Sequence, residues 1–146
     1  MTYQVRKLDV WVGEIEDSVG GLAGKLEPLA NAGADLQLLI ARRQPHLPGK
    51  GVVFLGGVAG AKATKAATAA GLTKATDLSA LSVAGPNKPG AAYQITRRLA
   101  DAGINLRGVS AGVLGSQFLL LLAFDSAADA DKAAQTLRAS GGTRKK

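Results

Sequence analysis

The chain repeats itself at a spacing of 70 residues, and this repeat constrains the fold more than any other feature. Residues 30–36, Ala-Asn-Ala-Gly-Ala-Asp-Leu, match residues 100–106, Ala-Asp-Ala-Gly-Ile-Asn-Leu. The same shift aligns three further pairs of landmarks: Gly20 with Gly90, Leu29 with Leu99, and Gly71 with Gly141. Unrelated segments rarely agree at one spacing, so the pattern indicates that one structural unit has been duplicated.

Both copies show the same order of expected elements. Alternating apolar residues predict long strands at residues 3–15 and 73–83, each followed by a helix. The remaining expected elements are helices at 22–32, 61–70, 90–102 and 127–139 and strands at 36–41, 52–55, 106–111 and 118–124. Strand, helix, strand, strand, helix, strand is the split βαβ plan. We therefore predict an α+β fold of two ferredoxin-like βαββαβ modules, with antiparallel sheets and helices on one face. Pro28 predicts a kink or an early break in the first helix.

The second copy lacks a fourth strand of its own, since the sequence ends soon after Gly141. The 70-residue shift places residues 73–77 over residues 3–7, which predicts that residues 3–7 fill this position. The long strands would then be shared between the modules. The expected organisation is a first module at 8–78, a second at 79–140 that includes residues 3–7, and a flexible basic tail at 141–146.

The composition argues against several classes of function. There is no cysteine and one histidine among 146 residues, which excludes thiolate metal sites and disulfides and disfavours zinc. His46 lies between prolines with no Ser, Cys or acid placed to form a catalytic set. We therefore expect no enzyme activity, no metal and no cofactor. With no signal peptide, and with residues 118–124 as its longest apolar run, the protein is expected to be cytoplasmic and not membrane-bound.

The formal charge of +7 is distributed unevenly, because residues 36–76 contain no acid. A basic surface attracts anions, either nucleic acid or small acids. Aromatic residues make up 4% of the chain, which is few for a protein that stacks bases.

The turn Asn87-Lys88-Pro89-Gly90 is the strongest candidate for a binding site. Proline suits the start of a helix, and glycine lets a ligand approach the backbone. The unpaired N–H groups at a helix start favour a carboxylate or a phosphate. The sequence therefore predicts an anion-binding turn here.

These residues also carry a resemblance to a known family. Pro89-Gly90 followed by Leu99–Leu106 resembles the ACT domain, a small regulatory module that binds amino acids. Residues 3–140 are similar to stand-alone tandem ACT proteins. The resemblance implies a ligand where two modules meet, held through backbone by the turn after the first strand and by the start of the second strand.

The resemblance implies a set of binding residues in each copy. In the second copy they are Asn87, Lys88, Pro89, Gly90, Ala91, Ile104, Asn105 and Leu106. In the first copy they are Asp17, Ser18, Val19, Gly20, Gly21, Ala34, Asp35 and Leu36. The first copy departs from the pattern in that Val19 replaces the proline.

The leading hypothesis is a non-catalytic regulatory protein that binds an amino acid or a related carboxylate. With no catalytic domain recognised, its output would require a protein partner or a homo-oligomer. One alternative is a nucleic-acid-binding module, since the RNA-recognition fold has the same element order, although the aromatic content argues against it. The other is a structural assembly protein with empty sites.

Overall fold

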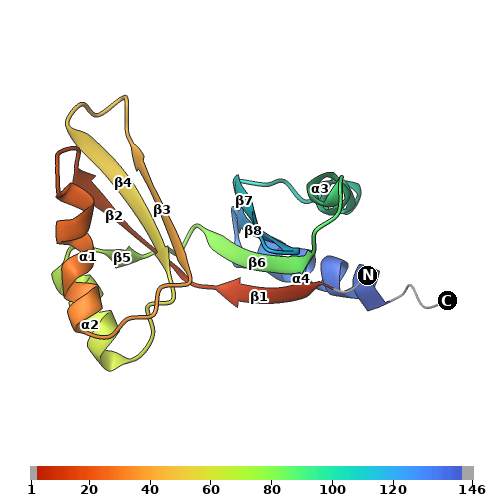
Figure 1. Cartoon of the computed structure of the whole chain (residues 1–146), viewed down its shortest axis with the longest axis horizontal. Coiled ribbons are helices and arrows are strands. Elements are labelled where there is room, and N and C mark those ends of the chain that lie inside the picture. The colour runs from red at the N-terminus through yellow and green to blue at the C-terminus, as the bar shows by residue number, and fades with distance from the viewer. Residues whose placement is uncertain (1–2, 143–146) are drawn as a thin grey trace. The chain divides into compact units, whose positions relative to one another are not determined.

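A computed structural model describes residues 3–142 of the chain (Figure 1). It divides into two compact units. The first module is Asp9–Ala75, and the second module combines residues 3–8 with residues 76–142. The elements in chain order are β1 (Gln4–Leu8), β2 (Val10–Glu16), α1 (Gly21–Asn31), β3 (Leu38–Arg43), β4 (Lys50–Gly56), α2 (Ala61–Ala69), β5 (Thr73–Lys74), β6 (Ser79–Pro86), α3 (Ala91–Asp101), β7 (Gly108–Leu114), β8 (Gln117–Phe124) and α4 (Ala127–Gly142).

The first module is a four-stranded antiparallel sheet covered by two helices. Its strand order is β3-β4-β2-β5, and α1 and α2 lie together on one face (Figure 1). Alternation along β2 and β4 points every second side chain toward the helices. The resulting core consists of Trp11, Leu29, Val53, Leu55, Ala67 and Leu72.

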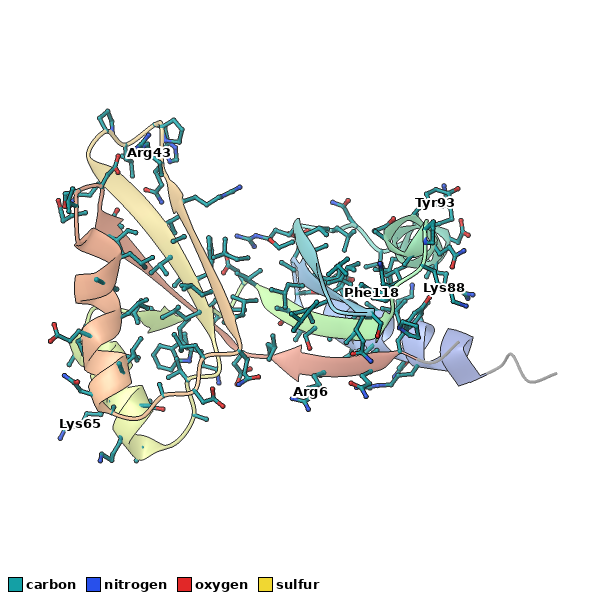
Figure 2. The ribbon with its side chains drawn as sticks, viewed as in Figure 1. Arg6, Arg43, Lys65, Lys88, Tyr93 and Phe118 are labelled. Atoms are coloured by element: carbon teal, nitrogen blue, oxygen red, sulfur yellow. The ribbon has the colours of Figure 1, made fainter. Side chains whose placement is uncertain are left out.

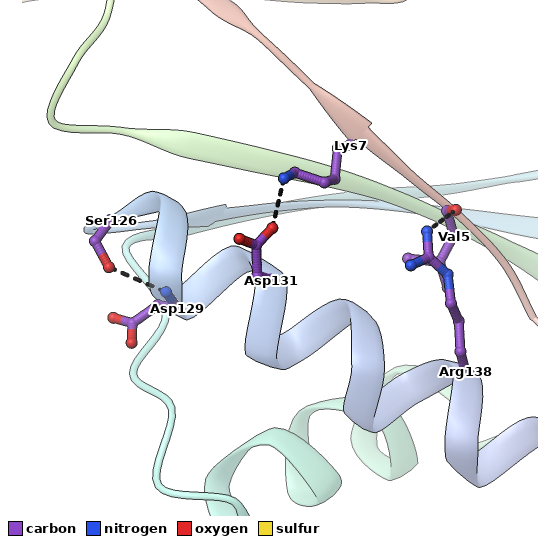
Figure 3. Close-up of polar contacts among 6 residues, drawn as sticks. All are labelled: Val5, Lys7, Ser126, Asp129, Asp131 and Arg138. Atoms are coloured by element: carbon purple, nitrogen blue, oxygen red, sulfur yellow. Dashed lines mark hydrogen bonds and ion pairs between the residues drawn. The ribbon is translucent and has the colours of Figure 1, made fainter.

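The second module has the same plan, with strand order β1-β6-β8-β7. Its core joins apolar side chains of β6 and β8 to those of α3 and α4, among them Leu81, Ile95, Leu122 and Leu137. Helix α4 also holds β1 by polar contacts (Figure 3). The guanidinium of Arg138 donates to the Val5 carbonyl at 2.9 Å, and Lys7 forms an ion pair with Asp131.

Strand β1 opens the chain but belongs to the sheet of the second module. It pairs antiparallel with β6, from Gln4 opposite Ala84 to Leu8 opposite Ala80. This is the pairing that the repeat predicts for residues 3–7. Asp9 alone separates β1 from β2, so one long stretch of chain serves both sheets. The predicted α+β class with strands shared between two ferredoxin-like modules is confirmed.

The 70-residue shift holds for the first half of each module and then falls to 67. Helices α1 and α3 are related by 70 residues, but Leu38 pairs with Gly56 whereas Gly108 pairs with Ala123. The β3–β4 connection is longer than the β7–β8 turn, and the extra residues change the offset.

Two details of the predicted alignment are therefore wrong. Gly71 follows α2, whereas Gly141 lies inside α4, so these glycines are not equivalent. Lys74 lies opposite Trp11 and Lys7 opposite Leu81, so β5 corresponds to β1 at the shorter shift. Because α4 ends at Gly142, the predicted tail lies outside the described residues from position 143 on.

The predicted break at Pro28 is also wrong. Helix α1 continues through Pro28 to Asn31. The proline removes one hydrogen bond, which would have reached the carbonyl of Gly24. The ladder then resumes, since the Ala32 N–H donates to the Pro28 carbonyl at 3.1 Å. Burial of Leu29, which is 1% exposed, holds the last turn against the sheet.

Candidate ligand sites

The turn of the second module, residues 87–90, joins β6 to α3. Gly90 has φ +86°, a left-handed conformation that favours glycine. The Asn87 N–H donates to the Ser116 carbonyl at 2.8 Å, which ties the start of the turn to the β7–β8 turn. The backbone of this turn is thus fixed by glycine conformation and by one long-range hydrogen bond.

The start of α3 keeps unpaired donors. The Ala91 N–H donates to the Lys88 carbonyl at 3.1 Å, and no side chain caps the helix. Within residues 3–142, the N–H groups of Ala92 and Tyr93 have no hydrogen-bond partner. Lys88 and Tyr93 lie on the exposed side of this helix start (Figure 2). The predicted anion-binding turn is therefore accessible.

The turn of the first module, residues 17–21, repeats this backbone. Gly20 has φ +83°, and the Gly21 N–H donates to the Ser18 carbonyl at 3.0 Å. Val19, at the position of Pro89, is fully exposed. The N–H groups of the next two residues, 22 and 23, likewise have no partner in the described part of the chain.

A short ion pair constrains the first turn from the side. The Asp17 carboxylate accepts a hydrogen bond from Nε of Arg43 at 2.7 Å, and the Asp17 N–H donates to the Gly49 carbonyl at 3.0 Å. Figure 2 shows Arg43 at the outer end of the β3–β4 hairpin. Arg43 already neutralises Asp17, so this carboxylate is not a free partner for a ligand ammonium group.

The predicted strand starts lie far from the turns of their own modules. In the first module the turn follows Glu16, opposite Lys50, whereas residues 34–36 lead to Leu38, opposite Gly56. These are the two ends of β4, about 20 Å apart at about 3.3 Å per residue. One small ligand therefore cannot touch both predicted segments of this module.

The second module separates its two segments in the same way. Its turn follows Pro86, opposite Gln117, and residues 104–106 lead to Gly108, opposite Ala123 at the other end of β8. Of these three residues, Ile104 is buried in the core, and only Asn105 is exposed. The turn and the strand start of one copy therefore do not form one contiguous site, and their part in ligand binding stays a prediction.

A hollow of about 250 Å³ lies beside the first turn. It is lined by Glu14, Ile15, Glu16, Gly21, Gly24, Lys25, Pro28 and Ala70. Of these, Gly21 alone belongs to the predicted set. The spacing of residues 21, 24, 25 and 28 places them on one helix face, and this was the sequence signal for three of the seven others. Lys25 Nζ donates to the Ala70 carbonyl at 2.8 Å, which holds a cation at the hollow.

A second hollow, of about 280 Å³, lies on the sheet of the second module. It is lined by Ser110, Ala111, Gly112, Val113, Leu114, Leu119 and Leu121. It has no charged side chain and so offers little to a carboxylate. No group of three potential metal-ligating residues occurs in the part of the chain that is described. No helix within residues 3–142 is long and apolar enough to cross a membrane.

The aromatic rings do not form a base-stacking surface. Phe118 and Phe124 are 4% and 0% exposed in the core of the second module. Tyr3 packs edge-on against Phe118, and Trp11 is buried in the first module. Phe54 on β4 is half-buried and Tyr93 on α3 is exposed, but they belong to different modules. The described residues therefore hold no exposed aromatic pair on one sheet, which the nucleic-acid alternative requires.

No protein-family model matches the chain, and no curated protein matches its sequence significantly. Solved structures share its fold. The regulatory subunit of aspartate kinase from Thermus thermophilus has a TM-score of 0.63 and 15% identity, over 94% of this chain and 95% of that one. A protein from Bacteroides thetaiotaomicron has a TM-score of 0.70 and 17% identity, over 94% and 90% of the two chains.

The same fold also occurs as part of a larger enzyme. Aspartate kinase from Synechocystis has a TM-score of 0.65 and 19% identity, over 97% of this chain but 26% of that one. At these identities the similarity establishes the fold. The architecture of two ferredoxin-like modules predicted from the sequence is confirmed.

Proposed function

We propose that this protein is a non-catalytic regulatory protein that binds a free amino acid or a related carboxylate. Its fold matches, over nearly the whole length of both chains, a regulatory subunit of aspartate kinase. A regulatory subunit of that kind acts through another protein, so output here would pass to a protein partner or to a second copy.

One observation carries this proposal. Both modules open their first helix with a left-handed glycine, Gly20 or Gly90, and leave the next free N–H groups without a side-chain cap. Such N–H groups and the positive end of the helix dipole favour a carboxylate. The same arrangement in both copies gives the protein two places at which a small anion can be held by backbone alone.

Binding would act by shifting a population of conformations. A ligand stabilises the arrangement that it binds more tightly, in proportion to its differential affinity. No bond needs to be made or broken, which fits the absence of a nucleophile–base pair among the described residues.

A thermal-shift screen with the twenty amino acids and a set of small anions tests the proposal. A ligand at 100 times its Kd adds about 2.7 kcal/mol to the free energy of unfolding. For modules of this size that raises Tm by on the order of 10 °C. Flat melting curves across the panel would contradict amino-acid binding.

The variant Gly90→Val then tests whether the turn of the second module takes part in ligand binding. A β-branched residue is strained at φ +86°, so Gly90→Val should distort the turn and remove any response that depends on it. Gly103→Val is the matched control, because Gly103 has φ +78° with open space around it and lies at the far end of α3. Equal responses in both variants would place the ligand away from this turn.

A further inference from the structure

The hollow of the first module exposes a stretch of β2 that no strand covers. Backbone groups of successive residues point to opposite sides of a strand. The Ala75 N–H donates to the Val10 carbonyl at 2.8 Å, which places the backbone of Val10 on the β5 side. By the same alternation, Glu14 and Glu16 direct backbone groups to that side.

Strand β5 is too short to reach these groups. It consists of Thr73–Lys74 and extends no farther along β2 than Val12. Among the described residues, the N–H and C=O of Glu14 and the N–H of Glu16 have no partner on this edge. They lie instead at the rim of the 250 Å³ hollow.

The equivalent place in the second module is closed. Gln4 pairs with Ala84, the counterpart of Glu14, and Pro86, the counterpart of Glu16, has no N–H to offer. The ring of Tyr3 lies against Gly85 and Phe118 and is 8% exposed. In the second module, residues 3 and 4 therefore cover the strand edge that stays uncovered in the first module.

Helix α1, which faces this edge, is also less closely packed here than its counterpart α3. In the second module the counterparts of Lys25 and Ala70 are Ile95 and Leu137, both fully buried. In the first module Lys25 is a cation that uses one of its three N–H donors on Ala70. Above it, a Cβ atom added at Gly24 would meet no atom within 4 Å. One copy has a packed core here, and the other has open space beside a charge.

We propose that this hollow binds a free aliphatic α-amino acid in the manner of a missing strand residue. The ligand ammonium donates to the Glu14 carbonyl. The ligand carboxylate accepts from the free N–H groups of the edge and from the Lys25 ammonium. The apolar part of the lining, Ile15, Pro28 and the small residues of α1, accepts an aliphatic side chain. This inference rests on the proposed function and places its ligand in the first module.

The test fills the hollow without disturbing the helix. Gly24→Leu adds a side chain to open space and replaces a poor helix former by a good one. Gln94→Leu is the matched control, since Gln94 occupies the equivalent position of α3 and is exposed. Both variants are screened by thermal shift with each aliphatic amino acid that stabilises the unmodified protein.

We expect Gly24→Leu to lose the response and Gln94→Leu to keep it. Lys25→Met retains the apolar stem of the side chain but loses a charge-assisted hydrogen bond to the ligand. It should therefore lower the affinity for the ligand about tenfold or more. The carboxamide and N-acetyl derivatives of the responding amino acid should not bind.

The outcomes separate the two proposals. An unmodified protein that responds to no amino acid overturns the proposed function. An unmodified protein that responds, together with a Gly24→Leu variant that responds equally, overturns the hollow as the site and leaves amino-acid binding in place. A response to the N-acetyl derivative equal to that of the free amino acid overturns the role of the ligand's charged ammonium group at the Glu14 carbonyl.

Discussion

Replacing Tyr3 with alanine should destabilise the second module, although Tyr3 lies at the opposite end of the sequence from most of that module. Its ring is 8% exposed and packs edge-on against Phe118, with ring centroids 6.0 Å apart. It also covers Gly85, where an added Cβ would come within 3.1 Å of the ring. Tyr3 thus closes one end of the core between β6 and β8.

The cost follows from the size of the ring. Truncating a buried aromatic side chain to alanine costs about 3–5 kcal/mol. Tyr3 precedes β1 at the edge of the sheet, where the chain can relax, so the lower end of about 3 kcal/mol is expected. This corresponds to roughly a 100-fold rise in the population of the open second module.

Two probes separate the modules. Hydrogen exchange of β6 and β8 reports the second module, and exchange that requires its global opening should become about 100-fold faster in Tyr3→Ala. Trp11, the single tryptophan of the sequence, lies in the core of the first module and reports that module by fluorescence. Its urea midpoint should stay the same.

Tyr3→Phe is the control for the hydroxyl group, which makes no hydrogen bond to any of the described residues. Its exchange rates should stay close to those of the unmodified protein. If Tyr3→Ala left β6 and β8 as protected as before, or if β4 lost protection equally, the assignment of β1 to the second module would be refuted.

Three further perturbations follow from the structure. Pro28→Ala restores an N–H for the Gly24 carbonyl and should raise the free energy of unfolding, measured by urea denaturation, by about 1–2 kcal/mol; a lower free energy would show that the proline is needed. Leu99→Ala empties a fully buried position and should cost about 3 kcal/mol, measured by hydrogen exchange of α3; a change below about 1 kcal/mol would contradict tight packing there. The hydrogen bond and attraction of Glu16 raise the pKa of Lys50 above its ordinary 10.5, so the pair stabilises the fold below pH 10.5 and loses this effect as the pH rises through the raised pKa. Glu16→Gln should lower the pKa of Lys50 in an NMR titration, and an unchanged pKa would remove the assigned cause.

The helices that follow the first strands were predictable because glycines mark their ends. Gly20 and Gly33 bound α1, Gly90 and Gly103 bound α3, and all four have positive φ. A left-handed residue stops or starts a helix whatever the tertiary structure, so these signals are local. The repeat then predicted the pairing of β1 with β6, a contact between distant segments that local patterns cannot reveal.

The site was less predictable, for two physical reasons. The family resemblance implied binding residues at 17–21 and at 34–36, but a pattern of alternating residues identifies the face of a strand and not the end of the sheet where it lies, and these segments lie at opposite ends of β4. The order of strand, helix and strand contains this information, since each crossing returns the chain to the other end. The hollow depends instead on the shortness of β5, on the missing side chain at Gly24 and on the charge of Lys25. The periodicity of apolar residues predicts none of these three features.

The pairing of β1 with β6 also predicts an order of events during folding. Residues 4–8 have no partner until residues 79–86 come near them, and closing so long a loop costs entropy that grows with its length. Folding of Asp9–Ala75 reduces that cost, because the Lys74–Asp9 ion pair at 3.2 Å and the bond from Ala75 to Val10 bring its two ends together. Once the first module has folded, the end of β1 and the start of β6 are held near each other and can pair. A mutation that slows folding of the first module should therefore delay assembly of the second module's core, although the first module contributes no side chain to that core.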